Sequence, residues 1–458
     1  MAAGIVIPTQ NGVIDDAPTE GSRMYAIVVC VFASLAGIFF GYDQGVTGGV
    51  LVMDSFLEDF CLDYDGNTWE ECHRSSSKLP GNWRTFTTMY NVMYYLGCLI
   101  GAAIGGWVAD RYGRRLTIFN AGAFFIVGTI WVIVTPKDEH TVVLFGRIVQ
   151  GMGVGNSSFS VPIFGAEMAP KELRGLLSGF MQMTVVTGLL LANGINVAVE
   201  DTDEGWRITN GVALLPPVIV MLGIFCVPES PRWMYKFKGR DAAEVTLKKL
   251  RQTENVHREL DAIGEQLALE GEDVAWMELL DPSIRRRVLI AMFLQVLQQA
   301  TGINPIMTYG AQIFKDVVGD GVMSLLIMSI VNFVSTIPAI ALGHSFGRRS
   351  LLLIVCWIYP AEIFPLNVRA KAVSLSTMSN WGMGAIMIAV PKLFPYLNIN
   401  GVFFLFFGLC ACCGVFVYFF CPETKGLLLE DIEALFNGKA TRKGVSPKYE
   451  EVATPQVA

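Results

Sequence analysis

The strongest constraint on this chain is a series of apolar runs, each about as long as a bilayer-crossing helix, which needs about 20 largely apolar residues. Of the 458 residues, 52% are hydrophobic and 16% are charged, whereas a soluble domain has about 25% charged residues. The runs lie near residues 24–42, 88–109, 116–135, 142–164, 176–198, 207–227, 286–314, 321–343, 371–390 and 401–421. The sequence therefore predicts an all-α integral membrane protein with about ten spans.

Charged residues change sign from one loop to the next. The loops after the second, fourth and eighth runs are basic, and the loops after the first and fifth runs are acidic. Because basic loops stay on the cytoplasmic side, both termini are expected in the cytoplasm. A polar stretch, 228–285, is expected to form cytoplasmic helices between two membrane parts. The net charge of −7 gives no reason to expect nucleic acid as a partner.

Short motifs occur twice along the chain, each time after a predicted span. Gly-Trp-Val-Ala-Asp-Arg-Tyr-Gly-Arg-Arg (106–115) is matched by Gly-His-Ser-Phe-Gly-Arg-Arg (343–349). The segments around Glu167 and Glu362 form a second pair, and Pro-Glu at 228 and at 422 forms a third. Two parallel halves of six spans would give this repeat. The expected units are a tail (1–23), the first half (24–227), the linker (228–285), the second half (286–436) and a tail (437–458).

The second half is too short for six spans. In the first half, 51 residues lie between Arg115 and Glu167 and contain two apolar runs, whereas only 12 residues lie between Arg349 and Glu362. The run 351–358 is too short to cross a bilayer even once. We therefore expect most of the ninth and tenth spans to be missing, with the truncation between 353 and 357. Losing a pair of spans leaves the orientation of the later ones unchanged.

Together these motifs resemble the sugar porter family of the major facilitator superfamily. The segment Gln-Gln-Ala-Thr-Gly-Ile-Asn (298–304) is similar to the family's sugar-binding signature. The segment Gly-Tyr-Asp-Gln-Gly (41–45) resembles hexose:proton symporters more than passive carriers. The chain departs from the family pattern at His344, where an acidic residue is usual, and at Phe164, where Tyr is common. The resemblance implies a major facilitator fold and alternating-access transport of a monosaccharide with a proton. It implies a monomer in the bilayer with no cofactor and no enzymatic activity.

The resemblance implies a sugar site built from residues of the spans. Amide side chains suit a hexose because they donate and accept hydrogen bonds without carrying net charge. The implied residues are Gln182, Gln298, Gln299, Asn304, Asn332 and Trp357. The alternative for the amides is hydrogen bonding between neighbouring helices. The alternative for Trp357 is an anchor at the membrane interface, because most of its span is missing.

Asp43 lies at the far end of the first span, where an ionisable side chain is costly and usually functional. By resemblance, Asp43 binds the proton and Arg147 holds the charge of the carboxylate when the proton leaves. Burial would raise the pKa of a carboxyl group and a nearby arginine would lower it, so a proton carrier needs these influences to change between its two states. The alternative is a static salt bridge that seals one end of the bundle.

Charged residues at the predicted cytoplasmic ends would form a gate that closes through ion pairs. These are Asp110, Arg111, Arg114, Arg115, Glu167, Arg174, Glu229, Arg232, Arg348, Arg349, Glu362, Arg369 and Glu423. A gate requires only that such pairs differ by a few kcal/mol between two states. The alternative is that these residues serve orientation alone.

Two of the ten cysteines, Cys61 and Cys72, share one polar loop on the predicted outer side. An oxidising compartment would favour a disulfide there, although spacing alone does not fix its geometry. The histidines show no metal-ligand spacing, so no metal site is expected. The predicted function is sugar transport, with the plasma membrane as the expected location. The alternatives are a truncated or mis-spliced porter with little or no transport, and a sugar-sensing receptor.

Overall fold

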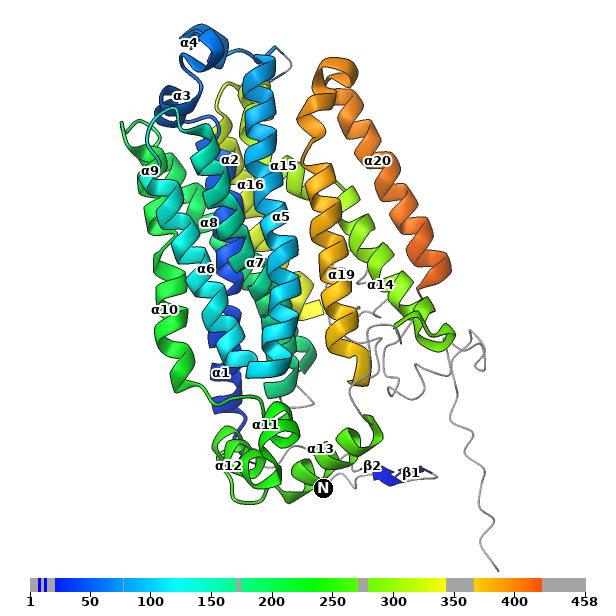
Figure 1. Cartoon of the computed structure of the whole chain (residues 1–458). Coiled ribbons are helices and arrows are strands. Elements are labelled where there is room, and N and C mark those ends of the chain that lie inside the picture. Colours follow the sequence, from blue (N-terminus) through cyan, green and yellow to red (C-terminus); the bar gives the residue numbers. More distant parts are fainter. Residues whose placement is uncertain are drawn as a thin grey trace, which may run out of the picture.

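The computed structural model shows a bundle of long helices lying side by side (Figure 1). The structure describes residues 7–9, 12–14, 21–76, 78–169, 174–270, 279–342 and 366–421, and within 174–179 and 366–370 it describes the backbone alone. Two short strands, β1 (Ile7–Thr9) and β2 (Gly12–Ile14), pair antiparallel at one end of the bundle.

The first half of the chain supplies six long segments of the bundle. They are α1 (Met24–Ser34) with α2 (Gly37–Val50), α5 (Gly81–Tyr112), α6 (Arg114–Val134), α7 (His140–Met168), α8 (Arg174–Val199), and α9 (Gly205–Val212) with α10 (Leu215–Gly223) and the 3-10 turn η3 (Ile224–Cys226). Short helices cap one end of this half: α3 (Asp54–Phe60), the 3-10 turn η1 (Tyr64–Gly66) and α4 (Trp69–Cys72).

The second half supplies four long segments within the described residues. They are α14 (Pro282–Ala300) with α15 (Ile303–Val318), α16 (Gly321–Leu342), α19 (Leu366–Met387), and the 3-10 turn η5 (Val390–Leu393) with α20 (Phe394–Phe420). Between the halves lie α11 (Pro231–Lys238), α12 (Arg240–Arg251) and α13 (His257–Glu270). We call the end of the bundle beside α11–α13 the linker end and the opposite end the disulfide end (Figure 1).

Each of the ten predicted spans coincides with one of these long segments. The first runs on to Val50, and the second begins earlier than expected, at Gly81. Within the described residues, seven segments are long and apolar enough to cross a membrane by composition alone. The other three are α7, α14 with α15, and α19, and these carry several of the buried polar side chains described below.

Helices α5 and α7 pack closely because glycines line both contact surfaces. A Cβ built on Gly97 would lie 2.1 Å from the backbone oxygen of Ile148, and a Cβ on Gly155 would lie 1.9 Å from that of Cys98. Any side chain would therefore force these helices apart. Small residues let helices approach in lipid, where apolar side chains gain little from leaving water. This packing fixes α5 beside the charged part of α7.

The two halves meet along three pairs of helices: α2 with α15, α8 with α16, and α5 with α19. The halves differ in how well their helices are enclosed. In the most apolar window of a span, half of the residues are buried for the first and second spans, but only 17% for α16 and 22% for α20. The second half therefore exposes more of its helices, as expected if two neighbouring spans are missing.

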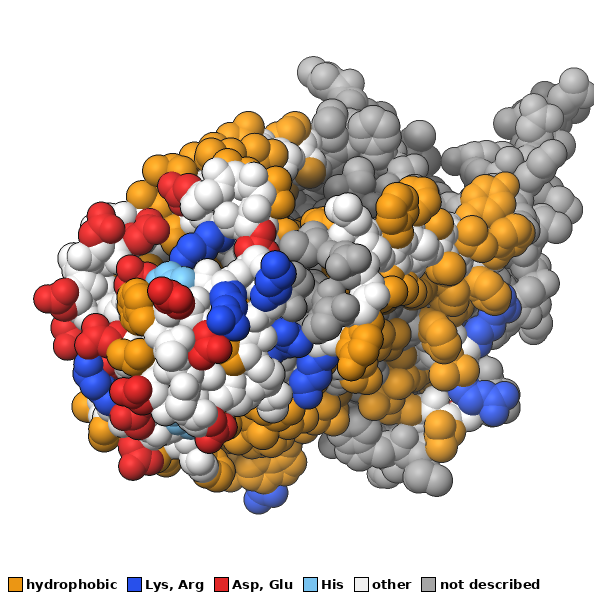
Figure 2. Space-filling view, turned by 90° about the horizontal axis from the view of Figure 1, so that it is seen from above, with side chains coloured by type: hydrophobic (Ala, Val, Ile, Leu, Met, Phe, Trp, Pro, Cys, Tyr) orange, Lys and Arg blue, Asp and Glu red, His pale blue; other side chains and the backbone are white. Residues whose placement is uncertain are grey.

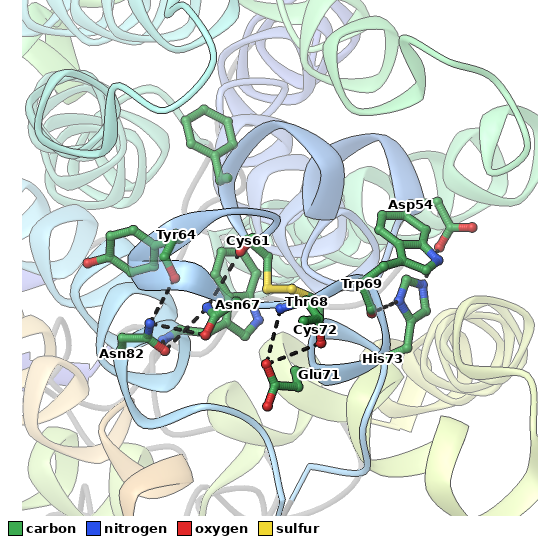
Figure 3. The surroundings of a disulfide bond; sticks show 12 residues. Asp54, Cys61, Tyr64, Asn67, Thr68, Trp69, Glu71, Cys72, His73 and Asn82 are labelled. Carbon is green, nitrogen blue, oxygen red and sulfur yellow. Dashed lines mark hydrogen bonds and ion pairs between the residues drawn. A yellow bond between two sulfur atoms is a disulfide. The ribbon is translucent and has the colours of Figure 1, made fainter.

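A disulfide joins Cys61 and Cys72 at the disulfide end, where the sequence raised it as one of two possibilities (Figure 3). Nearby, Asn67 and Asn82 exchange side-chain hydrogen bonds. The buried carboxylate of Asp59 accepts from Nε1 of Trp206 at 3.1 Å, which ties α3 to α9. Figure 2 views this end from above and shows acidic side chains gathered on the side of the first half. The acidic loops predicted from the sequence thus lie at one end of the bundle.

Candidate functional site

A network of amide side chains lies inside the second half, between α14, α15 and α19. Nε2 of Gln299 donates to Oδ1 of Asn380, and Nδ2 of Asn304 donates to Oε1 of Gln299, both at 2.8 Å. Nδ2 of Asn380 also lies within hydrogen-bond distance of the side-chain oxygens of Gln295 (2.7 Å) and Gln298 (2.8 Å). We call these five residues the amide cluster. It brings together three residues predicted to bind sugar: Gln298, Gln299 and Asn304.

The amide cluster lies where the seventh span is interrupted. Helix α14 ends at Ala300, and Gly302 adopts a left-handed φ of 81° before α15 begins at Ile303. Glycine takes this conformation without strain. A Cβ on Gly302 would lie 2.5 Å from the ring of Phe406, so a larger residue would also collide there. Just beyond the break, the backbone oxygen of Asn304 accepts from Nε2 of Gln44 at 3.3 Å, which links this span to the first half.

An aromatic wall adjoins the amide cluster on the side of the first half. Trp381 is fully buried and donates from Nε1 to Oγ of Ser158 at 3.2 Å. The rings of Phe40 and Tyr95 lie 5.2 Å and 5.7 Å from the ring of Trp381. The flat face of an indole is suited to packing on the apolar face of a sugar ring.

The sequence analysis did not select Gln295, Asn380 or Trp381. Asn380 is the centre of the amide cluster, since it bonds to three glutamines. The signal was available, because Gln295 and Asn380 are amides within predicted spans, as Gln298 and Gln299 are. The resemblance directed attention to the seventh span, and only the packing of α19 on α14 shows that Asn380 belongs with it.

The other predicted sugar-binding residues are placed apart from this network. Gln182 on α8 and Asn332 on α16 are partly exposed. Within the described residues, neither side chain is hydrogen-bonded to the amide cluster, and the backbone oxygen of Asn332 accepts from Thr336 within α16. Trp357 lies outside the described residues. The predicted roles of these three residues remain predictions.

Asp43 on α2 and Arg147 on α7 form an ion pair in the interior of the first half. Nη1 of Arg147 lies 2.6 Å from Oδ1 of Asp43, and Nη2 lies 3.2 Å from Oδ2. Only 2% of Asp43 and 1% of Arg147 are exposed. Removing two charges from water costs several kcal/mol each, so a buried pair persists only with good geometry and further hydrogen bonds. The predicted partners are therefore placed together.

Additional side chains surround the guanidinium of Arg147. Nη2 donates to Oγ1 of Thr47 at 3.1 Å, and Nη1 donates to Oε1 of Gln150 at 2.7 Å. The rings of Tyr90 and Tyr94 on α5 lie 4.5 Å and 4.4 Å from the guanidinium carbon. Aromatic faces attract a cation within about 6 Å. The positive charge is thus held by four neighbours besides Asp43.

A second polar cluster lies at the linker end, among residues predicted to form a gate. Arg114 and Glu167 form an ion pair at 3.0 Å, with 11% and 13% of their side chains exposed. The carboxylate of Glu229 accepts from the backbone nitrogens of Arg114 at 3.1 Å and Arg115 at 3.2 Å. These nitrogens open α6, where the first amides of a helix lack partners within it. Glu229 thus joins the linker to the start of α6.

Burial raises the pKa of Glu229 above its ordinary value of 4.5, although the backbone nitrogens of Ser230, Arg115 and Arg114 oppose the shift. Withdrawal from water disfavours the charged form of a carboxyl group. The burial of Glu229 between the linker and α6 should therefore make the stability of the folded protein depend on pH.

The remaining predicted gate residues are placed only in part. Asp110 lies 3.9 Å from Arg114, Arg111 stacks against Trp107 and Tyr112, and Arg232 lies on α11. The side chains of Arg174 and Arg369 are not among those described, and Arg348, Arg349, Glu362 and Glu423 lie outside the described residues. The second-half part of the predicted gate therefore stays a prediction.

A family model described as "Sugar (and other) transporter" matches residues 29–356 and 353–436 of the chain. The chain belongs to this family of sugar porters. Sugar transport protein MST5 of Oryza sativa is 30% identical over 510 residues, covering 95% of this chain and 94% of that protein. The probable glucose transporter rco-3 of Neurospora crassa is 29% identical over 490 residues, covering 91% of this chain and 80% of that protein.

Solved structures of the Escherichia coli xylose transporter XylE share the fold of this sugar porter. The proton:xylose symporter XylE bound to 6-bromo-6-deoxy-D-glucose matches with a TM-score of 0.77 at 22% identity, over 90% of this chain and 100% of that chain. Its partially occluded inward-open form matches with a TM-score of 0.73 at 22% identity, over 89% and 100%. The fold is therefore the major facilitator fold.

The family match also marks the short region of the second half. The family model matches in two pieces whose ends meet at 353–356, inside the interval where the sequence predicted a truncation. The alignment with rco-3 spans 490 positions but takes in 91% of the 458 residues, about 417, so about 70 positions face gaps in this chain. Over the aligned region the chain is thus about 70 residues shorter than the alignment with rco-3, and the loss of two spans stays a prediction.

We predict that Glu229→Gln flattens the pH dependence of thermal stability. Because the folded protein holds a proton on Glu229 at higher pH than the unfolded chain, stability falls as the pH rises from 4.5 through the raised pKa. The amide does not ionise and removes this contribution. The measurement is the unfolding temperature of purified protein across this range. Glu244→Gln is the control, because a hydrogen bond from Lys248 lowers the pKa of the partly exposed Glu244. An unchanged slope for Glu229→Gln would contradict the prediction.

Proposed function

We propose that this sugar porter carries a hexose across the membrane by alternating access, coupled to a proton that binds Asp43. The observation that carries the proposal is the amide cluster at the break of the seventh span, in which Gln295, Gln299 and Asn380 are buried. The relatives named as sugar and glucose transporters support the substrate class. The fold also supports the proposal, because its two halves meet beside the amide cluster. Alternating access requires that one half can rock against the other around the substrate site.

The amide cluster suits a hexose because it can exchange internal hydrogen bonds for bonds to sugar hydroxyls. Gln298, Gln299 and Asn304 offer both donors and acceptors. None of them is charged, so sugar binding does not require the removal of water from a charged group. Gln182 and Asn332 on the facing α8 and α16 are proposed to contact the sugar once it is bound. The competing role, helix association, would leave sugar affinity unaffected by substitutions here.

We predict that Gln299→Ala weakens D-glucose binding by at least about tenfold, because the amide that would exchange its bonds to Asn304 and Asn380 for bonds to sugar hydroxyls is lost. The measurement is glucose binding to the purified chain in detergent by isothermal titration calorimetry. Gln252→Ala, on the surface of the linker, is the control. Unchanged affinity in Gln299→Ala together with a lower unfolding temperature would favour helix association over sugar contact.

We propose that the linker end faces the cytoplasm and that the protein works as a monomer in the plasma membrane. The acidic face of the disulfide end supports this orientation, since basic loops favour the cytoplasmic side. The proposed gate at the linker end includes the Arg114–Glu167 pair and Glu229, which would separate when the cavity opens inward. Such a gate needs only a few kcal/mol between its two states.

We propose further that this chain transports only weakly because its cavity wall is incomplete. The low burial of α16 and α20 and the split family match support the proposal. A groove open to lipid beside the amide cluster would leave polar groups poorly sealed, and each unsatisfied group in hydrocarbon costs several kcal/mol. A skipped exon or a faulty gene model would account for such a clean deletion.

We predict that labelled glucose uptake by this chain in a transporter-null host is a small fraction of that by a version with the missing spans restored. The restored version carries the ninth and tenth spans of Arabidopsis sugar transport protein 10 inserted at 353–357. Surface expression of both proteins is measured in parallel. Robust accumulation by the 458-residue chain would contradict the prediction.

Asp43 is the proposed proton carrier because its carboxylate is the buried partner of Arg147. A carrier of this kind binds the proton in one state and returns it in the other, as the distance to the guanidinium changes. We propose that the ion pair in this structure is the deprotonated form.

We predict that Asp43→Asn abolishes uphill, uncoupler-sensitive glucose accumulation in the restored version, since the amide cannot carry a proton. Exchange of labelled for unlabelled glucose is expected to persist, because it needs no net proton movement. Glucose binding to the purified variant checks that it is folded. Accumulation that survives intact would mean that Asp43 does not carry the proton.

A further inference from the structure

Gln150 is a buried amide on α7, one turn from Arg147, and it lies outside the sugar site. Its Oε1 accepts from Nη1 of Arg147 at 2.7 Å, and its Nε2 donates to Oγ1 of Thr129 on α6 at 3.1 Å. Only 1% of Gln150 is exposed, and Thr129 is fully buried. The amide is therefore fixed at both ends, with its oxygen aimed at the guanidinium.

Nη1 of Arg147 is shared between two oxygens, Oδ1 of Asp43 at 2.6 Å and Oε1 of Gln150 at 2.7 Å. Nη1 carries two hydrogens, so each oxygen can accept one of them, and both oxygens stabilise the same positive charge. When a proton neutralises Asp43, the carboxylate is lost as a counter-charge, but the amide oxygen stays in place. Without Gln150 as well, Thr47 on Nη2 would be the one oxygen acceptor left among the bonds described for this guanidinium, and a buried charge with unpaired donors is strongly destabilised.

We propose that Gln150, held by Thr129, is a positioning residue that retains Arg147 when Asp43 is protonated and so sets the pH at which Asp43 takes up its proton. The proposal rests on the proposed proton site at Asp43 and extends it. Tyr90 and Tyr94 hold the guanidinium from α5 in both protonation states, whereas Gln150 is the neutral oxygen acceptor on Nη1.

The other titratable groups that face this pair lie on α5. They are Tyr90, Tyr94, Tyr95 and Cys98, which interact electrostatically with Asp43 and Arg147. Phenols and thiols ordinarily ionise near pH 10 and 8.5, above the range in which carboxyl groups titrate. Thr47 on α2 and Thr129 on α6 carry no charge. A pH effect of Gln150 therefore acts through the Asp43–Arg147 pair.

Two substitutions of Gln150 should shift proton uptake in opposite directions. Gln150→Met keeps the volume but removes the acceptor, so Nη1 has only Asp43 and the ionised pair is favoured; proton uptake then needs a lower pH. Gln150→Glu puts a second carboxylate beside Arg147, which weakens its hold on Asp43; proton uptake then occurs at a higher pH. Each shift is expected to be about one pH unit, the size of one hydrogen bond to a charged group.

The experiment is infrared difference spectroscopy of the purified full chain during a pH titration, which needs no transport. The carbonyl band of a protonated carboxyl group that is absent in Asp43→Asn reports Asp43, and the double variant with Gln150→Glu identifies the introduced group. Opposite shifts of the Asp43 midpoint support the proposal. An unchanged midpoint in both variants, or shifts in the same direction, would overturn it.

Thr129 provides a matched pair of variants. Thr129→Val removes the hydroxyl that holds the amide and is expected to shift the midpoint as Gln150→Met does, by a smaller amount, whereas Thr129→Ser keeps the wild-type midpoint. A role limited to joining α6 and α7 would lower the unfolding temperature without moving the midpoint. If no Asp43-dependent band titrates in the wild-type chain, the proposed proton site is wrong. If the band titrates but its midpoint is the same in the Gln150 variants, only this inference is wrong.

Discussion

The interior of a bilayer offers no water to hydrogen-bond, so every polar group buried there must find its partner within the protein. This constraint explains why the polar residues of the described spans form connected groups. Arg147 donates to Asp43, Thr47 and Gln150, and Gln150 in turn donates to Thr129. The closeness of α5 and α7, which the glycines permit, brings the two tyrosine rings over the guanidinium. The close packing of α5 against α7 therefore also places the aromatic rings that stabilise the charge of Arg147.

The same constraint gives the seventh span its importance. The seventh span is broken at Gly302, and just past the break Gln44 of the first half donates to the backbone oxygen of Asn304 in the first turn of α15. The amide cluster lies beside that break and is itself a set of interchangeable donors and acceptors. A group of this kind can open for a ligand without leaving any member unsatisfied. The break thus connects the proposed sugar site to the contact between halves.

The helices of the two halves are unequally enclosed within the described residues. The first half has its six segments and buries half of the residues in its first two spans, whereas α16 and α20 of the second half are largely uncovered. The family match splits in the same short region. The proposed proton site lies wholly in the first half, and the amide cluster lies in the second half. Proton binding and sugar passage should therefore be affected differently by the proposed loss of two spans, which is why the first can be tested without transport.

Much of this was readable from the sequence, because apolar runs of bilayer length must become helices and loop charges follow orientation. The ten segments, the Asp43–Arg147 partnership, three of the amides and the short second half were all predicted from residues and motifs. Tertiary structure alone decided which distant side chains meet. Asn380 became the centre of the amide cluster because α19 packs on α14, and Gln150, one turn from Arg147 on the same helix, is tied to α6 because Thr129 faces its amide. A sequence shows that a polar residue lies in a span, but its partner depends on which helix faces it.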